Sequence, residues 1–265
     1  MHRYRSEVLL PFLLVLAVLL QPPEAAAQES SSSVGVEVLK PSIDDTKMFN
    51  GAVFLTYTRM LTRSHALDVS LPLARSHKDS PLLEEEVLVG NPYVGGVRTS
   101  KDSPIFYTAG LRLPITSGEK PFARLMGEYT DLTRAGAFLP RTLVLEGTIG
   151  YGGVLDNGIQ YWGSAGPLFT FPFGEDEDAE SFLRFSASAL YEVMEGLQAG
   201  AGLSGIYGIT TDSLPYDGLV LQAVAGLEYD LGAVRPGITA RLPLSSDWGD
   251  AVDGILGLHL AVPLS

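Results

Sequence analysis

Short segments in which apolar and polar residues alternate run along most of this chain, and they constrain its fold more than any other feature. A period of two places alternate side chains on opposite faces of an extended strand. Five segments alternate regularly, at 65–75, 181–192, 219–229, 234–242 and 255–264, and seven alternate less regularly, at 34–40, 51–61, 87–98, 104–114, 140–151, 158–171 and 196–208. The sequence therefore predicts an all-β fold with twelve strands.

The first 27 residues have the three parts of a secretory signal peptide. Arg3 and Arg5 make the beginning of the chain basic, Val8–Leu20 is apolar, and Ala25–Ala27 supplies an A-x-A cleavage site. The apolar run is too short to cross the ~30 Å hydrocarbon core of a bilayer as a helix. We therefore expect residues 1–27 to be removed and residues 28–265 to form one exported domain.

An exported chain of alternating strands predicts a single antiparallel transmembrane β-barrel of about twelve strands in the outer membrane of a Gram-negative cell. Lipid-facing and lumen-facing residues alternate along such strands, and single-chain bacterial barrels have an even number of them. A soluble secreted β-sandwich stays open as an alternative, because a period of two does not distinguish lipid from a dry protein core.

The lengths of the predicted connections support the barrel. Long connections at 41–50, 76–86, 115–139, 172–180, 209–217 and 243–253 alternate with short ones near 61–64, 99–103, 152–157, 193–196 and 230–232. Outer-membrane barrels have short periplasmic turns and longer outer loops. Both chain termini are therefore expected on the periplasmic side.

Three strands that are predicted to run outward carry a Leu-Pro pair, at 71–72, 113–114 and 242–243. Proline lacks the N–H that a sheet ladder needs, so it is confined to strand ends, sheet edges and bulges. We expect all three pairs to end their strands at the same rim of the barrel.

The longest connection has a pattern of its own. Apolar residues recur at helical spacing within 121–138, and Pro121 suits the first turn of a helix. This spacing predicts a short amphipathic helix in the third outer loop, with an apolar stripe of Phe122, Leu125, Met126, Tyr129 and Leu132. The helix either folds into the barrel mouth as a constriction or caps the rim.

The composition excludes several classes of function. The chain has a formal net charge of −13 and no cysteine. A nucleic-acid backbone is bound by Lys and Arg, so nucleic acid is not an expected partner. Without cysteine, disulfides and thiolate metal sites are excluded.

Histidine is scarce and shows no catalytic or metal-binding pattern. After residue 27 only His65, His77 and His259 remain, without the spacing of a zinc site. Gly257 and Ala261 flank His259 on its own face, so no serine or carboxylate stands beside it for nucleophilic chemistry. We expect no catalytic residue, no metal site and no cofactor, and His259 is predicted to be an ordinary pore-lining group.

Acidic residues are densest in Gly174–Glu180, within a predicted outer loop. Clustered carboxylates suit Ca²⁺ or Mg²⁺, but this run lacks the spacing of a calcium-binding loop. A solvated loop is the favoured interpretation. Glycine-rich runs at 147–153 and 200–205 lie inside predicted strands, where we expect glycine to allow sheet curvature or close packing in the lumen.

Polar side chains on one face of the predicted strands are expected to line the barrel interior. Facing lipid costs Arg or Lys about 2–4 kcal/mol at the bilayer midplane, so charges inside a membrane barrel face water or each other. The predicted lumen residues are Asp68, Arg112, Glu146, Arg184, Gln198, Gln222, Glu228, Arg235 and Arg241. They either line a water-filled pore and set its ion preference, or form a salt-bridged network that plugs a narrow barrel.

Three motifs between residues 50 and 118 resemble the meta-pathway phenol-degradation family of outer-membrane proteins. Residues 68–72 (Asp-Val-Ser-Leu-Pro) resemble its strand that ends in Leu-Pro, residues 90–95 (Gly-Asn-Pro-Tyr-Val-Gly) its strand opening, and residues 111–118 (Leu-Arg-Leu-Pro-Ile-Thr-Ser-Gly) its rim turn. The rest of the chain resembles the family in the rhythm of its strands. The resemblance implies a transporter or porin for small solutes, among them apolar or aromatic compounds, and supplies no catalytic residues.

The sequence thus predicts a passive outer-membrane pore for small solutes and no enzyme. The alternative is a closed structural or adhesive barrel that works through its outer loops. A lipid-modifying barrel enzyme is a third hypothesis, and it would need His259. The expected partners are outer-membrane lipids, a small solute and the barrel assembly machinery.

Overall fold

The computed structural model describes residues 32–43, 50–77, 85–100, 103–174, 178–210 and 218–264. The expected signal peptide, residues 1–27, lies outside the described residues, and so do residues 175–177 at the centre of the acidic run.

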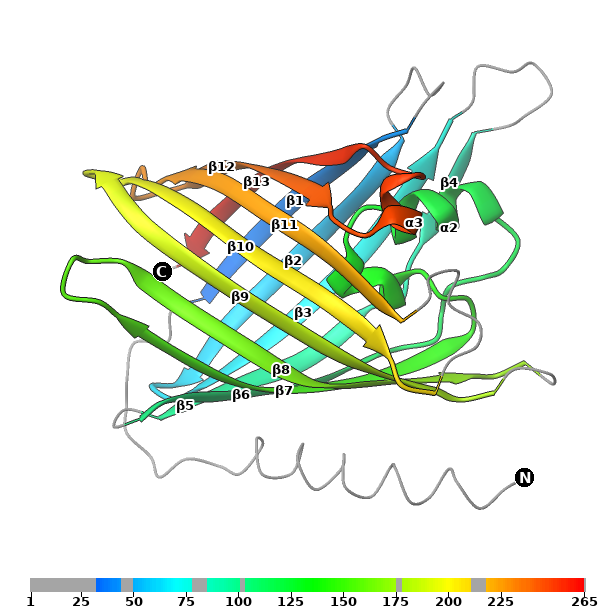
Figure 1. Cartoon of the computed structure of the whole chain (residues 1–265), viewed down its shortest axis with the longest axis horizontal. Coiled ribbons are helices and arrows are strands. Elements are labelled where there is room, and N and C mark those ends of the chain that lie inside the picture. The colour runs from blue at the N-terminus through cyan, green and yellow to red at the C-terminus, as the bar shows by residue number, and fades with distance from the viewer. Residues whose placement is uncertain are drawn as a thin grey trace.

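The described chain forms one antiparallel sheet that closes into a barrel (Figure 1). Its strand segments are β1 Ser32–Ser42, β2 Gly51–Thr62, β3 His65–Ser76, β4 Glu86–Val89, β5 Tyr93–Ser100, β6 Ser103–Arg112, β7 Thr142–Val154, β8 Gln160–Pro172, β9 Glu180–Met194, β10 Leu197–Gly208, β11 Leu219–Tyr229, β12 Arg235–Pro243 and β13 Gly254–Leu264. Helical elements in the described residues are α2 Pro121–Glu128, the 3₁₀-helix η1 Leu132–Ala137 and α3 Ser246–Gly249.

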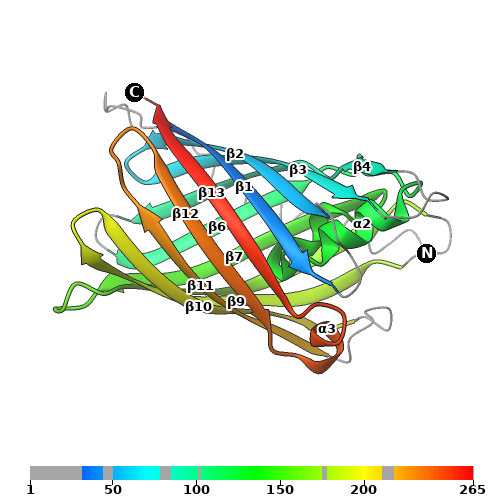
Figure 2. The same ribbon diagram turned by 90° about the horizontal axis from the view of Figure 1, so that it is seen from above.

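Each strand pairs with its neighbours in sequence, and the first pairs with the last. β1 lies between β2 and β13, with Ser32 opposite both Arg59 and Leu264. β3 then pairs with β2, which completes the ring of hydrogen bonds (Figure 2). Among the described strands, closure pairs both edges of all but β4, whose printed strand partner is β3; a membrane-spanning sheet requires such closure. The predicted all-β fold of twelve antiparallel strands is confirmed.

The predicted strand 87–98 is interrupted, and β4 and β5 together take its place. β3 pairs with β5 as far as Ser70 opposite Tyr93, and with β4 from Leu73 opposite Val89. Gly90, Asn91 and Pro92 separate the two segments. The twelve-stranded barrel therefore contains one strand with a break, opposite the second half of β3.

This break explains why the prediction for Pro72 was wrong. Pro72 does not end its strand, because β3 continues to Ser76. The Pro72 carbonyl accepts a hydrogen bond from Gly90 N at 2.9 Å. The N–H and C=O of one residue point to the same side of an antiparallel strand, so the missing N–H of Pro72 faces the gap between β4 and β5. Pro243 ends β12, and Pro114 follows the end of β6 as expected.

The two faces of the barrel wall differ in polarity, and the apolar face points outward. On β1 the side chains of Val34, Val36 and Val38 are exposed, as are Leu256 and Leu258 on β13. A ring of exposed aliphatic residues on the outside and polar residues on the inside is the pattern of a barrel in lipid. None of the helices in the described part of the chain is long and apolar enough to cross a membrane.

The connections define two different ends of the barrel. The short turns lie at one end, here called the short-turn end, together with Ser32 and Leu264. The longer connections lie at the opposite, long-loop end, where Figure 1 also shows α2 and α3. The predicted alternation of short and long connections is therefore present. Of the described chain, the start of β1 and the end of β13 meet on the side of the short turns.

The third long loop, residues 113–141 between β6 and β7, contains two short helices in place of one. α2 ends at Glu128 and η1 begins at Leu132. The predicted apolar stripe is wrong in part, because Phe122 is 43% exposed while the small residues Ala123 and Gly127 are buried. A Cβ on Gly127 would lie 2.5 Å from the Phe138 ring, so only glycine allows α2 to pack this closely against Phe138.

A buried apolar core occupies the interior of the barrel at the long-loop end. Its wall residues come from most strands: Leu39, Ala52, Phe54, Ala74, Leu88, Val144, Leu168, Phe182, Ile206, Val220 and Ile255. The third long loop adds Ala123, Leu132, Ala137 and Phe138 to the middle of this ring, and Trp248 of α3 and Val252 complete it. The loop therefore folds into the barrel mouth as a plug, the first of the two predicted arrangements.

Candidate lumen site

On the short-turn side of the apolar core, η1 is joined to the barrel wall by an ionic cluster. Asp131 Oδ2 lies 2.6 Å from Arg134 Nε and 2.6 Å from Arg241 Nη1. Glu37 of β1 pairs with the same two arginines, at 2.7 Å to Arg241 Nη2 and also to Arg134 Nη2. In this ionic cluster each of the two carboxylates thus pairs with both guanidinium groups.

The charges of this cluster hold one another in their ionised forms. Although burial raises the pKa of Asp131, Arg241, Arg134 and the Thr133 hydroxyl together hold it well below its usual range. Burial lowers the pKa of Arg134, but Asp131 and Glu37 raise it by more, so the net shift of the pKa is upward. Both shifts favour the charged forms of Asp131 and Arg134. Removal of one member would leave a buried charge without its partner, which is strongly destabilising.

A second ion pair joins η1 to the opposite wall. Arg184 Nη1 of β9 lies 2.9 Å from Glu146 Oε2 of β7 and donates to the Thr133 carbonyl at 3.3 Å. Arg112 of β6 is buried beside it, with its guanidinium 5.2 Å above the ring of Tyr93. η1 is thus held from two sides across the lumen.

Asn91, in the break between β4 and β5, fixes the third long loop to the wall. Its side chain is fully buried. Nδ2 donates to the carbonyls of Leu139 at 2.7 Å, Gly136 at 3.3 Å and Thr142 at 3.4 Å, and Oδ1 accepts from Thr116 N at 2.9 Å. The interruption of the strand therefore allows the buried amide of Asn91 to form hydrogen bonds with both ends of the loop.

We expect Asn91→Asp to loosen the loop. The substitution keeps the shape of the side chain but places a carboxylate oxygen against three carbonyl oxygens, and an unsatisfied buried polar group costs about 1–3 kcal/mol, more when it is charged. Trypsin should then cleave the folded protein faster after Arg124 or Arg134. Asn157→Asp is the control, because Asn157 only accepts from Ile159 N in an exposed turn, which aspartate does equally well. Equal cleavage rates in both variants would contradict the assignment.

Glu128 at the end of α2 has a pKa that is shifted towards neutrality. Burial raises its pKa to about 7 from an ordinary value of 4.5, and Arg124, whose Nε lies 3.5 Å away, opposes this only in part. The folded loop therefore binds a proton that the released loop does not bind between these pH values. The closed packing has this contribution in full below pH 4.5 and loses it as the pH rises through about 7.

This predicts a loop that loosens with rising pH. An environment-sensitive dye on Phe122→Cys would report it, since the chain has no other cysteine. Its emission should change between about pH 4.5 and pH 7, and adding Glu128→Gln should remove the change. Glu119→Gln, at an exposed residue before the helix, should leave it intact. A pH response that survives Glu128→Gln would refute the role of Glu128.

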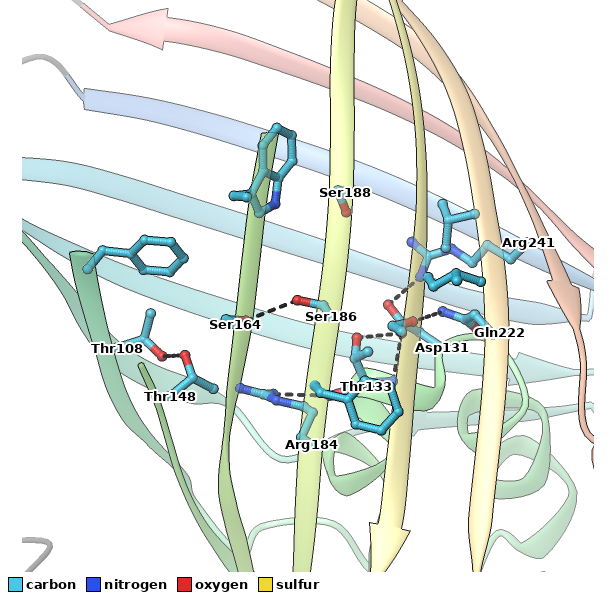
Figure 3. Close-up of a pocket in the computed structure, with 16 residues that line it drawn as sticks. Thr108, Asp131, Thr133, Thr148, Ser164, Arg184, Ser186, Ser188, Gln222 and Arg241 are labelled. Atoms are coloured by element: carbon cyan, nitrogen blue, oxygen red, sulfur yellow. Dashed lines mark hydrogen bonds and ion pairs between the residues drawn. The ribbon is translucent and has the colours of Figure 1, made fainter. Parts of the chain in front are cut away.

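A cavity of about 460 Å³ lies in the lumen under the ionic cluster (Figure 3). Asp131, Thr133, Arg184 and Arg241 border it on one side, as the close-up shows. Hydroxyl and amide groups of the wall line much of the rest: Thr108, Thr148, Ser164, Ser186, Ser188, Ser204 and Gln222. The ionic cluster thus separates an apolar plug from a polar chamber.

The predicted lumen residues fall into three places. Arg112, Glu146, Arg184, Gln222 and Arg241 lie in or beside the ionic layer. Asp68, whose Oδ1 accepts from Thr58, and Glu228, paired with His259 Nε2 at 2.8 Å, lie nearer the short-turn end, and Gln198 is opposite Glu228 in the sheet register. Arg235 lies at the short-turn rim, 3.0 Å from Asp230, with a half-exposed side chain.

Sequence reasoning did not single out Glu37, Asn91, Asp131 or Arg134. Glu37 could have been found, because it alternates with the outward valines of β1 and so faces inward. Asp131 and Arg134 lie in a loop, where no period assigns a face. Asn91 was recognised as part of a motif, but nothing local indicated that the strand would break there to let it reach the loop.

Solved structures share this fold. An outer-membrane channel from Pseudomonas putida F1 is 13% identical and superimposes with a TM-score of 0.65, covering 92% of this chain and 100% of that chain. The NanC porin (7% identical, TM-score 0.55) covers 87% of this chain and 100% of that chain. The KdgM porin (10% identical, TM-score 0.54) covers 88% of this chain and 99% of that chain. Neither a protein-family model nor a curated protein sequence matches the chain.

These likenesses show the fold and its class. The chain is a closed twelve-stranded antiparallel barrel of the kind found in outer-membrane channels and porins. At these identities they do not carry over a solute, so the lumen itself has to supply the argument for function.

Proposed function

We propose that this protein is a passive outer-membrane pore for small solutes whose outer mouth is closed by its third long loop. The observation that carries the proposal is the contrast between the two halves of the interior. The short-turn half holds a polar chamber with charged walls, inside a barrel whose outer surface is apolar. A lumen lined by paired charges and hydroxyls holds water and small polar molecules.

The plug makes the pore a gated one. The apolar core at the long-loop end and the ionic cluster below it join the loop to strands on all sides. Passage through the barrel therefore requires that the loop leaves its place. In this proposal the loop moves as a unit, because its salt bridges and its apolar contacts are made by the same short segment.

The proposed place of the protein follows from the same fold. We propose that it lies in the outer membrane, among outer-membrane lipids, with the short turns and both termini in the periplasm and the long loops outside. Export through residues 1–27 and insertion by the barrel assembly machinery complete this proposal. Short periplasmic turns and long outer loops are the usual arrangement of bacterial barrels.

The meta-pathway resemblance proposes apolar or aromatic solutes. Phe106 and Trp162 line the chamber, and their aromatic rings could contact such a compound. This solute class stays a prediction of the resemblance, and the lining of the chamber combines hydroxyl side chains with apolar ones.

A closed barrel that works through its outer loops is the second candidate. The buried core at the long-loop end favours it, since such a core also serves as a permanent stopper. We propose no catalytic role. His259 is paired with Glu228 and rests against Gly237, where a Cβ would lie 2.0 Å from its ring. His259→Ala should therefore remove no enzymatic activity.

Planar-bilayer recording of the purified full chain tests the pore. The expected result is ion conductance with long closed periods, together with a faster gel mobility of the unboiled protein than of the boiled one. Deletion of residues 120–138 should raise the open fraction. A correctly folded barrel that stays non-conducting after this deletion would overturn the pore and leave the loop-based alternative.

A further inference from the structure

The polar chamber offers an unusual combination of groups for a water-filled pore. Its ionic groups are already paired: Asp131 with Arg134 and Arg241, and Arg184 with Glu146. An ionic solute would have to compete with these partners at short distance. Arg241 Nε has no hydrogen-bond partner among the described residues, but the charge of each of these arginines is balanced by a carboxylate. The capacity that remains for a ligand therefore has little net charge, and much of it belongs to neutral groups.

That neutral capacity comes from hydroxyl pairs on adjacent strands. The hydroxyls of Thr108 and Thr148 lie 2.7 Å apart, and those of Ser164 and Ser186 lie 3.0 Å apart (Figure 3). Within each pair one hydroxyl donates to the other, which leaves one O–H and several lone pairs free. The two pairs thus present donors and acceptors along the wall of the same chamber.

Gln222 adds a buried acceptor without a partner. Its side chain is 1% exposed, and Nε2 donates to Ser204 Oγ at 3.1 Å. Among the described residues no donor reaches Gln222 Oε1. Because an unsatisfied buried carbonyl destabilises the folded state, a ligand O–H that reaches Oε1 would gain a bond that the empty chamber lacks.

Aromatic rings stand among these hydroxyls. Trp162 is 39% exposed and borders the chamber with Phe106. A Cβ on Gly150 would lie 2.1 Å from the Phe106 ring, so this ring rests closely on the wall. A flat apolar surface beside neutral donors and acceptors matches a molecule with an apolar face and a rim of hydroxyls, which is the structure of a sugar ring.

We propose that the chamber is a binding subsite for a neutral polyhydroxylated solute of mono- or disaccharide size. The inference rests on the proposed pore and names the solute class for it. About 460 Å³ falls in the size range of ligand pockets. An aromatic hydrocarbon would desolvate the hydroxyls and Gln222 Oε1 without replacing their bonds, at an expense of about 1–3 kcal/mol for each group.

Intrinsic fluorescence tests this without using conductance. The chain has two tryptophans, Trp162 in the chamber and Trp248 in the apolar core. In detergent-solubilised Trp248→Phe protein the emission therefore comes from Trp162. Titration with maltose should change it saturably, whereas gluconate and benzyl alcohol should not. Saturation by benzyl alcohol or gluconate in place of maltose, or no response to any of the three, would overturn the proposal.

Two substitutions locate the subsite. In the Trp248→Phe background, Gln222→Leu should weaken maltose binding about two- to tenfold, the range that corresponds to a net hydrogen bond of ~0.5–1.5 kcal/mol. Gln160→Leu, at the exposed first residue of β8, should leave it unchanged. The double variant Ser164→Ala and Ser186→Ala gives a second measurement if Gln222→Leu does not fold. Unchanged affinity in the folded variants would refute the assignment.

Bilayer recording separates the two proposals. Conductance without a saturable maltose response overturns the sugar subsite and leaves the pore. A saturable response in a protein that never conducts, even without residues 120–138, supports the subsite and overturns the pore.

Discussion

Asp131→Asn is expected to release the third long loop and to raise the open fraction of the pore by about two to four orders of magnitude. The substitution keeps the shape of the side chain but removes the negative charge that Arg134 and Arg241 share. In the described part of the chain, Glu37 then remains as the only carboxylate bonded to these two guanidinium groups. Breaking a buried ion pair by removing one partner destabilises by about 3–5 kcal/mol, and each 1.4 kcal/mol is tenfold in an equilibrium.

The measurement is single-channel recording, together with trypsin cleavage after Arg134. Asp230→Asn is the matched control, because Asp230 also pairs with an arginine but in an exposed turn. Exposed ion pairs contribute only about 0–1 kcal/mol, so this variant should behave like the native chain. An Asp131→Asn protein with native gating and native resistance to trypsin would refute the ionic cluster as the element that holds the loop.

Phe138→Ala is expected to loosen the plug from its apolar side by about 3–5 kcal/mol, the usual effect of removing a buried phenylalanine. Phe138 is fully buried, and its ring centroid lies 6.0 Å from that of Phe54 in an edge-on arrangement. The guanidinium of Arg134 lies 3.8 Å above the other partner, Phe54. The substitution therefore weakens the ionic cluster as well as the core.

Phe122→Ala is the control for this prediction. Phe122 belongs to the same loop and is the same residue type, but it is 43% exposed, so its loss should leave conductance and loop protection unchanged. Both proteins should keep the gel shift on boiling, since the hydrogen bonds of the wall are not touched. If Phe138→Ala opens the loop to trypsin but conductance stays at zero, the barrel is closed below the plug and the loop-based alternative is favoured.

The two substitutions affect different parts of the plug. The apolar core and the ionic cluster are both made by residues 123–138, so either one alone should not be sufficient to keep the loop in place. A double variant of Asp131 and Phe138 should show a coupling between the two substitutions, because Arg134 contacts both neighbourhoods.

The strands were predictable because a barrel in lipid imposes one rule on every strand. Lipid contacts alternate residues and the lumen contacts the others, so the period of two in 255–264 or 219–229 reports the face directly. The same rule indicated that Arg112, Glu146, Arg184 and Arg241 turn inward. It did not indicate which of them would pair, because partners on different strands depend on register and on what fills the lumen.

The third long loop was predictable only in outline. Helical spacing at 121–138 indicated helical structure, and Pro121 does begin α2. Met126 and Leu132 of the predicted stripe are buried, but Phe122 is exposed, and the confined barrel mouth also buries the small residues Ala123 and Gly127. Likewise Pro72 was predicted to end a strand, and it instead lies where the neighbouring strand is broken.

The sequence by itself therefore determined the class of the fold, the strand count and the faces of the regularly alternating strands, because these follow from local periodicity and from the polarity of the two surroundings of the wall. Only the tertiary structure decided that η1 crosses the lumen, that Glu37 and Arg241 meet Asp131 and Arg134, and that a polar chamber lies beneath. Those contacts join residues as far apart as Glu37 and Arg241, 204 positions along the chain, and ring closure brings them together with a loop that has no periodic order of its own.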